Sequence, residues 1–280
     1  MKPHLLDRIR DSVLDFLGYR IERATEFSRI HDFLLTLRPV DAGVPLIRVG
    51  GIEDGGYLLP DSLEDIGAVI SPGVGASSVF ELHFAERNIP CILIDGTVAV
   101  EPFPHPQFTF LHKMLTPSSA LPGEITLAKA VDLLDGETRN MILQMDIEGA
   151  EWDVLGSVQP DLMKRFKILV IEFHGFDKMI ERKSTFDRVE RVFSGLFSLF
   201  TPVHIHINNY LPARPLRAKG LRFFRNRIEV PPIVELTFLR NDLMPKTRKF
   251  AEIPHPLDMK NMPELPDVPP PHVWAYQPNS

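Results

Sequence analysis

The chain has a single cysteine, Cys91, among 280 residues, and this excludes an intrachain disulfide framework. It also lacks an uncharged apolar run long enough to cross a membrane. Basic residues are not in excess, and a net charge of −6 argues against general nucleic-acid binding, which needs a basic surface. The first residues carry Asp7, Asp11 and Asp15 within an apolar pattern, unlike a signal or transit peptide. We therefore expect a cytoplasmic protein that has no transmembrane segment and no nucleic-acid partner.

Strand-like and helix-like stretches alternate from residue 66 onward. The sequence predicts helices near 77–87, 125–134, 149–158 and 181–198. It predicts strands at 68–70, 91–94, 108–111, 141–144 and 168–171. This alternation favours an α/β fold whose parallel sheet has helices on both faces. Two later apolar strands, 200–207 and 233–239, have no clear helix between them and predict a C-terminal antiparallel hairpin at one edge.

The two ends of the chain differ from this central part. Residues 1–40 have apolar side chains at helical spacing and predict an N-terminal helical segment, which would pack on the main domain or form a homo-oligomer interface. Residues 251–280 hold eight of the 26 prolines and predict an extended Pro-rich C-terminal tail. We expect the main domain to span residues 41–250.

A glycine-rich turn follows the first strand of the alternating region. Gly73 and Gly75 permit a tight turn, and Ser78 with Glu81 fits a capping box at the start of a helix. Asp95 stands twenty residues beyond Gly75, at the end of the second strand, where an acid can bind a ribose diol. These features together predict a nucleoside-cofactor site, although Asp95 could also belong to an ordinary Asp-Gly turn.

Residues 141–152 are the most informative stretch of the chain. An apolar strand leads directly into Asp146, Glu148 and Glu151, with Gly149 between the last two. Acids are costly inside a sheet, but at the carboxyl end of a parallel strand they face the ligand crevice of open α/β folds. We therefore expect ligand contacts here. The alternative is a solvated turn whose acids favour the start of a helix.

Two more strand ends carry residues suited to proton transfer. Glu172 and His174 alternate with apolar residues after the fifth strand, so both project to one side. His204 and His206 share a face of the next strand, which continues into Asn208 and Asn209. Histidine suits proton transfer near neutral pH, although a strand histidine is often simply a core or edge residue.

Basic residues gather between the two late strands, where no acidic residue occurs from residue 191 to 228. They are Arg214, Arg217, Lys219, Arg222, Arg225 and Arg227. This segment is either a solvated loop or a contact for phosphate on a nucleotide-sugar, a lipid-linked glycan or an anionic membrane surface.

Residues 145–152 resemble the signature of the FkbM-type family of S-adenosylmethionine-dependent methyltransferases. The runs 206–209 and 234–239 resemble the closing hairpin of that family, and Asp54-Gly-Gly-Tyr57 resembles an element upstream of the cofactor loop. The likeness covers about residues 48–240. One departure is Ser71-Pro72, since related proteins often have an acidic residue at the start of the glycine loop.

The resemblance implies a Rossmann-like, seven-stranded, mostly parallel sheet with a final antiparallel strand. It also implies S-adenosyl-L-methionine as cofactor and O-methylation of a hydroxyl on a sugar, glycan or related small molecule. The acceptor could bear a phosphate. A divalent metal ion, held by acids and histidines at neighbouring strand ends, stays open.

The residues singled out fall into three roles. Those expected to bind the cofactor are Ser71, Pro72, Gly73, Val74, Gly75, Asp95 and Asp146. Those expected to take part in catalysis are Asp146, Glu172, His174, His204 and His206, with a histidine as the base and Asp146 orienting it or binding the acceptor. Those expected to contact the acceptor are Glu148, Asn208, Asn209, Arg214 and Arg217.

Two other functions remain open at this point. An NAD(P)-dependent oxidoreductase or epimerase would use the same glycines and Asp95, but Ser78 replaces its third glycine and the sequence has no Tyr-x-x-x-Lys pair. A non-catalytic domain could instead bind a carbohydrate or a partner protein through the basic segment.

Overall fold

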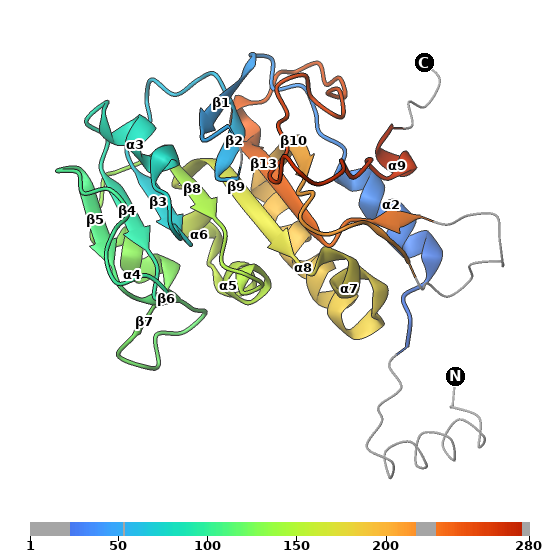
Figure 1. Cartoon of the computed structure of the whole chain (residues 1–280), viewed down its shortest axis with the longest axis horizontal. Coiled ribbons are helices and arrows are strands. Elements are labelled where there is room, and N and C mark those ends of the chain that lie inside the picture. Colours follow the sequence, from blue (N-terminus) through green and yellow to red (C-terminus); the bar gives the residue numbers. More distant parts are fainter. Residues whose placement is uncertain (1–22, 53, 217–227, 276–280) are drawn as a thin grey trace, which may run out of the picture.

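The computed structural model describes residues 23–52, 54–216 and 228–275. Its centre is a seven-stranded sheet of order β10-β13-β9-β8-β3-β4-β5 (Figure 1). These strands are β3 (Val69–Pro72), β4 (Cys91–Ile94), β5 (Phe108–Leu111), β8 (Met141–Met145), β9 (Phe166–His174), β10 (Phe200–Ile207) and β13 (Ile233–Arg240). The five strands from β3 to β9 pair in parallel, whereas β13 is antiparallel to both β9 and β10. The predicted α/β class and C-terminal hairpin are confirmed, and the sheet is mixed.

The remaining elements are short, apart from two helices. The helices are α2 (Phe27–Thr36), α3 (Val79–Ala85), α4 (Leu127–Val131), α5 (Glu151–Ser157), α6 (Pro160–Met163), α7 (Phe176–Glu181), α8 (Lys183–Leu199) and α9 (His272–Ala275), with a 3₁₀ turn at Asn241–Leu243. The minor strands are β1 (Leu46–Gly50), β2 (Gly56–Pro60), β6 (Met114–Leu115), β7 (Glu124–Ile125), β11 (Arg214–Pro215) and β12 (Glu229–Val230).

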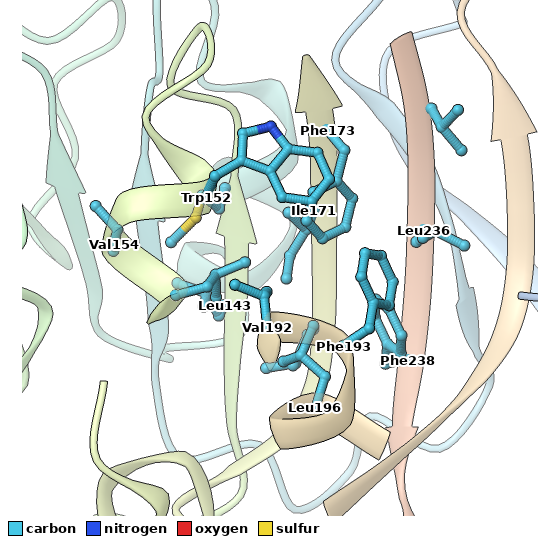
Figure 2. Packing of buried hydrophobic residues seen from close by; sticks show 14 of the residues in the cluster. Leu143, Trp152, Val154, Ile171, Phe173, Val192, Phe193, Leu196, Leu236 and Phe238 are labelled. Atoms are coloured by element: carbon cyan, nitrogen blue, oxygen red, sulfur yellow. The ribbon is translucent and has the colours of Figure 1, made fainter. Parts of the chain in front are cut away.

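Helices α2, α4, α5 and α8 cover one face of the sheet through a large apolar cluster. Figure 2 shows part of this cluster, in which Trp152 of α5 and Phe193 of α8 lie against Phe173 of β9. The ring centres of Trp152 and Phe173 are 4.9 Å apart, and those of Phe173 and Phe193 are 5.1 Å apart. The motif of residues 145–152 therefore ends in a tryptophan that anchors its helix to the sheet.

The other face is covered by α3 together with the antiparallel hairpin β1–β2, so the expectation of helices on both faces holds only in part. Every residue of β2 is buried, because the hairpin lies on the sheet and the Thr237 hydroxyl donates to the Leu58 carbonyl oxygen at 2.8 Å. Tyr57 of this hairpin packs edge to face against Phe80 of α3, with ring centres 5.6 Å apart. The hairpin thus becomes one wall of the site described below.

The ends of the described chain pack on the main sheet and on each other. Phe33 of α2 contacts the aromatic rings of Phe176, Phe186 and Phe193, and the indole N–H of Trp274 in α9 donates to a backbone carbonyl of α2. The part of the predicted N-terminal helical segment before residue 23 lies outside the described residues. No helix among residues 23–52, 54–216 and 228–275 is long and apolar enough to cross a membrane.

Candidate active site

A cavity of about 430 Å³ lies at the carboxyl ends of β3, β4 and β8. Its walls come from the β3–α3 turn, the segments that follow β4, β5 and β8, and the hairpin β1–β2. The residues expected to bind a cofactor that line it are Gly73, Val74, Gly75, Asp95 and Asp146. Ser71 and Pro72 do not line the cavity, because both are buried within β3.

The glycine turn fits closely against its neighbours. Gly73 has a φ of +87°, and a Cβ atom there would lie 1.5 Å from the carbonyl oxygen of Asp146. Only glycine therefore fits where the turn after β3 lies against the turn after β8. Gly75 has a φ of +59°, and its position for a Cβ atom has nothing within 4 Å. The first glycine is therefore needed for packing between strands, and the second for the shape of the turn.

Asp95 ties the end of β4 to this turn. Its Oδ2 accepts from the backbone N–H of Gly75 at 2.8 Å, and its Oδ1 accepts from the backbone N–H and hydroxyl of Thr97 at 2.7 and 2.6 Å. Burial alone would raise the pKa of Asp95, but these donors outweigh it and lower the pKa. The carboxylate is thus ionised, and Oδ2 retains a lone pair that can accept from a ligand hydroxyl.

The predicted capping box at the start of α3 is wrong, although the helix begins directly after Ser78 as expected. The Ser78 side chain makes no capping hydrogen bond. Glu81 instead turns inward, and the Ser71 hydroxyl lies within hydrogen-bond distance of both Glu81 Oε1 and, at 2.5 Å, Gln144 Oε1, so its one proton can be donated to either oxygen. The Gln144 amide donates to the Tyr57 hydroxyl at 3.3 Å, and the four side chains form a buried polar chain from α3 to the hairpin.

The acidic turn after β8 is organised around Glu151. Glu148 and Gly149 both have positive φ angles, +55° and +106°, and the backbone N–H groups of Ile147 and Gly149 donate to Glu151 Oε1 at 3.1 Å. The same oxygen lies 3.1 Å from Nδ1 of His174. Glu151 has no exposed surface, so its carboxylate stabilises the turn and orients a histidine from the neighbouring strand.

His174 presents its second ring nitrogen to three carboxylates. Nε2 lies 3.4 Å from Glu148, 3.4 Å from Glu172 and 3.8 Å from Asp146. A proton on Nδ1, donated to Glu151, leaves Nε2 as the basic atom. Burial lowers the pKa of His174, but the hydrogen bond and charge of Glu151, with the charges of Asp146 and Glu148, outweigh burial and raise it.

Two of these acids are themselves perturbed by burial. Burial raises the pKa of Asp146 to about 7, the nearby His174 opposes the shift, and Glu148 adds to it. Burial, followed by the charges of Glu235 and Asp146, raises the pKa of Glu172 well above its usual range. Near neutral pH the cluster can therefore hold a proton on more than one carboxyl.

The other two predicted catalytic histidines face the C-terminal tail, and none of Glu172, His174, His204 and His206 is among the residues that line the cavity of about 430 Å³. His204 Nε2 lies 2.9 Å from Asp258, and His206 lies 3.4 Å from Asp258 and 3.0 Å from the Asn261 side-chain oxygen. Burial lowers the pKa of His204; the pKa of His206 is raised to about 9, because Glu235 and Asp258 outweigh its burial. The structure thus separates both histidines from the acids around His174.

The tail also binds Asn209, one of the residues predicted to contact the acceptor. Asn209 donates to the carbonyl oxygen of Met262 at 2.8 Å, whereas Asn208 donates to Glu172 Oε1 at 3.2 Å and so supports the acidic cluster. A second cavity, of about 640 Å³, lies between the tail and the end of β10 and includes His206 and Asn209 in its wall.

Arg214 is engaged in ion pairs within the fold. Its guanidinium contacts Asp177 and lies 3.0 Å from Glu181. These two carboxylates balance the positive charge of Arg214, so it needs no phosphate ligand. Arg217 and the remaining basic residues of that segment, 219–227, lie outside the described residues. Glu148, by contrast, lines the cavity with a side chain that is 86% exposed.

Several residues of the cavity wall were not predicted to have a role. They are Asp54, Tyr57, Glu81, Lys113 and Gln144. The Asp54–Tyr57 run carried a signal through its paired glycines and its likeness to an upstream element. Glu81 and Gln144 carried none, because an acid early in a helix and a polar residue in a strand are ordinary in isolation.

Two groups among the described residues have the donor atoms for a metal ion. One comprises Asp146, Glu148 and His174, and the other Asp54, Glu172 and Glu235; in each, the candidate ligand atoms lie within 4.8 Å of one another. Each group contains one buried carboxyl oxygen that has no hydrogen-bond partner among the described residues, from Asp146 in the first group and from Glu172 in the second. Both groups therefore fit a divalent cation.

A match to one family model agrees with the motif. Residues 122–214 match the family model described as methyltransferase FkbM domain. No curated protein matches this chain. Among solved structures, the precorrin-6y C5,15-methyltransferase of Geobacter metallireducens GS-15 is 12% identical, with a TM-score of 0.33, over 63% of this chain and 82% of that one. A structure described as "Conversion of a Disulfide Bond into a Thioacetal Group during Echinomycin Biosynthesis" is 15% identical, with a TM-score of 0.31, over 72% and 84%.

The matched region contains the acidic turn, Glu151, Trp152 and His174. Its match is to the family that the motif at 145–152 resembles. The chain is a methyltransferase, and its residues 122–214 are similar to the methyltransferase FkbM domain.

Proposed function

We propose that this methyltransferase uses S-adenosyl-L-methionine to methylate a hydroxyl group of a sugar, glycan or related small molecule. The observation that carries the choice of cofactor is the charge of the cavity. Five carboxylic acids line it, against one lysine: Asp54, Glu81, Asp95, Asp146 and Glu148, with Lys113.

This charge favours a cationic ligand over an anionic one. S-adenosylmethionine carries a sulfonium and an ammonium group, both of which are stabilised by nearby carboxylates, whereas the pyrophosphate of a dinucleotide would be repelled by them. The volume of about 430 Å³ lies within the range typical of small-molecule pockets. The Asp95–Gly75 pair supplies the remaining requirement, an ionised acid beside the glycine turn that can accept from a ribose hydroxyl.

The acceptor hydroxyl must lose a proton as the new carbon–oxygen bond forms, and His174 is the proposed base. The bound cofactor supplies an electrophilic methyl group on a sulfonium. Nε2 of His174 takes the hydroxyl proton, while Glu151 holds the ring by Nδ1 and stabilises the resulting imidazolium. Asp146 and Glu148 lie beside Nε2 at the cavity wall, where they can accept hydrogen bonds from an acceptor hydroxyl and align it for in-line attack.

A divalent metal ion is a second way to activate the hydroxyl. Asp146, Glu148 and His174 would hold it, and it would lower the pKa of a bound hydroxyl group. The two routes make different predictions, since activity that depends on His174 as a free base persists in a chelator and metal-assisted activity is lost. For a phosphate-bearing acceptor we propose residues 217–227 as the contact.

The cofactor is tested by calorimetric titration with S-adenosylhomocysteine and, separately, with NAD. We expect saturable binding of the first and none of the second at millimolar concentration. Binding of NAD alone would favour the oxidoreductase alternative. Incubation with labelled S-adenosylmethionine and a panel of glycosides, followed by mass spectrometry, tests for methyl ethers. Cofactor binding without transfer to any acceptor in the panel would favour the non-catalytic alternative.

A further inference from the structure

Glu81 is a buried acid that the proposed reaction does not use. It lies in α3, is 2% exposed, and forms part of the cavity wall. Its Oε1 is bonded to the Ser71 hydroxyl, whereas its Oε2 is buried and has no hydrogen-bond partner among the described residues. An unpaired carboxylate oxygen in such a place is costly unless a ligand supplies a donor or a positive charge.

The position of Glu81 separates it from the acid proposed to bind ribose. Asp95 is bonded to the turn at Gly75, at the end of β4. Glu81 is bonded to Ser71 within β3, and from there the polar chain runs through Gln144 to Tyr57 on the hairpin. Both acids line the same cavity, so one ligand can contact Asp95 with its ribose end and Glu81 with its other end.

We propose that Glu81 is the recognition residue for the α-ammonium group of the cofactor's methionyl end, an inference that rests on the proposed function. The ammonium supplies the positive charge and the N–H donors that Oε2 lacks. The hydroxyl of Ser71, in the strand before the glycine loop, holds the Glu81 carboxylate in place.

Binding at this site should release protons from Glu81, and this release can be measured. Burial raises the pKa of Glu81 to about 7, with the Ser71 hydrogen bond opposing the shift. The titratable group packed against it is Cys91, whose pKa is raised by burial and by Glu81, so this thiol stays neutral. An ammonium beside Glu81 favours the ionised carboxylate, so binding at pH 7 releases up to about half a proton from a group of this pKa.

The test compares two ligands that share adenosine and sulfur and differ in the amino-acid end: S-adenosylhomocysteine and 5′-methylthioadenosine. Each is titrated into the full chain, the Glu81→Gln variant and the Glu86→Gln variant, whose substituted side chain lies exposed just after the same helix. We expect Glu81→Gln to weaken S-adenosylhomocysteine binding about 10- to 100-fold, and methylthioadenosine binding by no more than about threefold. Glu86→Gln should change neither.

Calorimetry in two buffers of different ionisation enthalpy gives the number of protons released when the ligand binds. Glu81→Gln should remove the proton release seen for S-adenosylhomocysteine with the unchanged chain. Equal binding of S-adenosylhomocysteine by the variant and the unchanged chain, or an equal loss of both ligands, would overturn the assignment. It would also be overturned if Asp146→Asn, rather than Glu81→Gln, removed the preference for S-adenosylhomocysteine. If the unchanged chain bound neither ligand, the proposed function itself would fail.

Discussion

Replacing Glu151 by glutamine tests how the structure orients and charges His174, the proposed base. The carboxylate accepts from Nδ1 of His174 at 3.1 Å and has no exposed surface, so solvent does not weaken the interaction. A hydrogen bond to a charged group contributes about 1.5–3 kcal/mol. That energy corresponds to about 1–2 pKa units, which is the drop expected for His174 in the Glu151→Gln variant.

The direction of the effect follows from the role of the base. His174 must be neutral to accept a proton, so kcat rises as the pH increases through its pKa. Glu151 raises that pKa, and its loss should move the acidic limb of the profile about 1–2 units lower while reducing the plateau about 10- to 100-fold. Removing the base itself, in His174→Ala, should cost about 10²- to 10⁴-fold and abolish this limb.

The assay is the pH dependence of methyl transfer under saturating cofactor. Glu137→Gln, an exposed position before β8, serves as the matched control and should leave the profile unchanged. Thermal unfolding of each variant separates a local effect from loss of the fold. An unshifted acidic limb in folded Glu151→Gln would refute the reasoning, as would effects of Glu151→Gln and His174→Ala that simply add in the double variant.

Other consequences can be measured independently. Gly73→Ala should abolish cofactor binding, because its Cβ atom would lie 1.5 Å from a backbone oxygen of the turn after β8, whereas Gly75→Ala has open space and should cost only about 1–2 kcal/mol of unfolding free energy; equal losses would contradict this. Phe193→Ala should reduce the free energy of unfolding in urea by about 3–5 kcal/mol, and a loss below 1 kcal/mol would show that the cluster relaxes. His206 has a raised pKa, so its ion pair with Asp258 stabilises the tail fully below about pH 6.5 and loses this effect as the pH rises through about 9; hydrogen exchange in the tail should increase over that range, and unchanged exchange would disprove the role.

The features that could be predicted from the sequence depend on short spacings. The strand and helix pattern gave the strands of the main sheet, since burial within each strand makes long apolar runs. The glycine turn and Asp95 belong to one strand–turn–helix–strand unit, and the expected closeness of Asp95 to the turn is seen in its bond to Gly75. The acidic motif was likewise local, although it is Glu151, not Asp146, that makes the hydrogen bond orienting His174.

The features that could not be predicted depend on distant partners. Glu81 satisfied a local capping rule, but its real partner, Ser71, lies on a strand. His204 and His206 do lie on one side of their strand, with ring planes 11° apart, yet that side is filled by Asp258 and Asn261 from the tail. A proline-rich segment without periodicity gives no indication of where it packs, so its contacts with these two histidines could not be predicted.

The amide of Asn261 gives the C-terminal segment a part in the electrostatics of the proposed reaction centre. It donates to Asp54 at 3.0 Å and to Glu235 at 2.7 Å, and so holds two like-charged side chains in a fixed relation. A chain cleaved after residue 250 would lose the hydrogen bonds from Asn261 to both side chains. Proteolysis far from the glycine turn would then increase the repulsion between Asp54 and Glu235, so the described part of the tail, residues 251–275, contributes to the electrostatics of the acidic cluster.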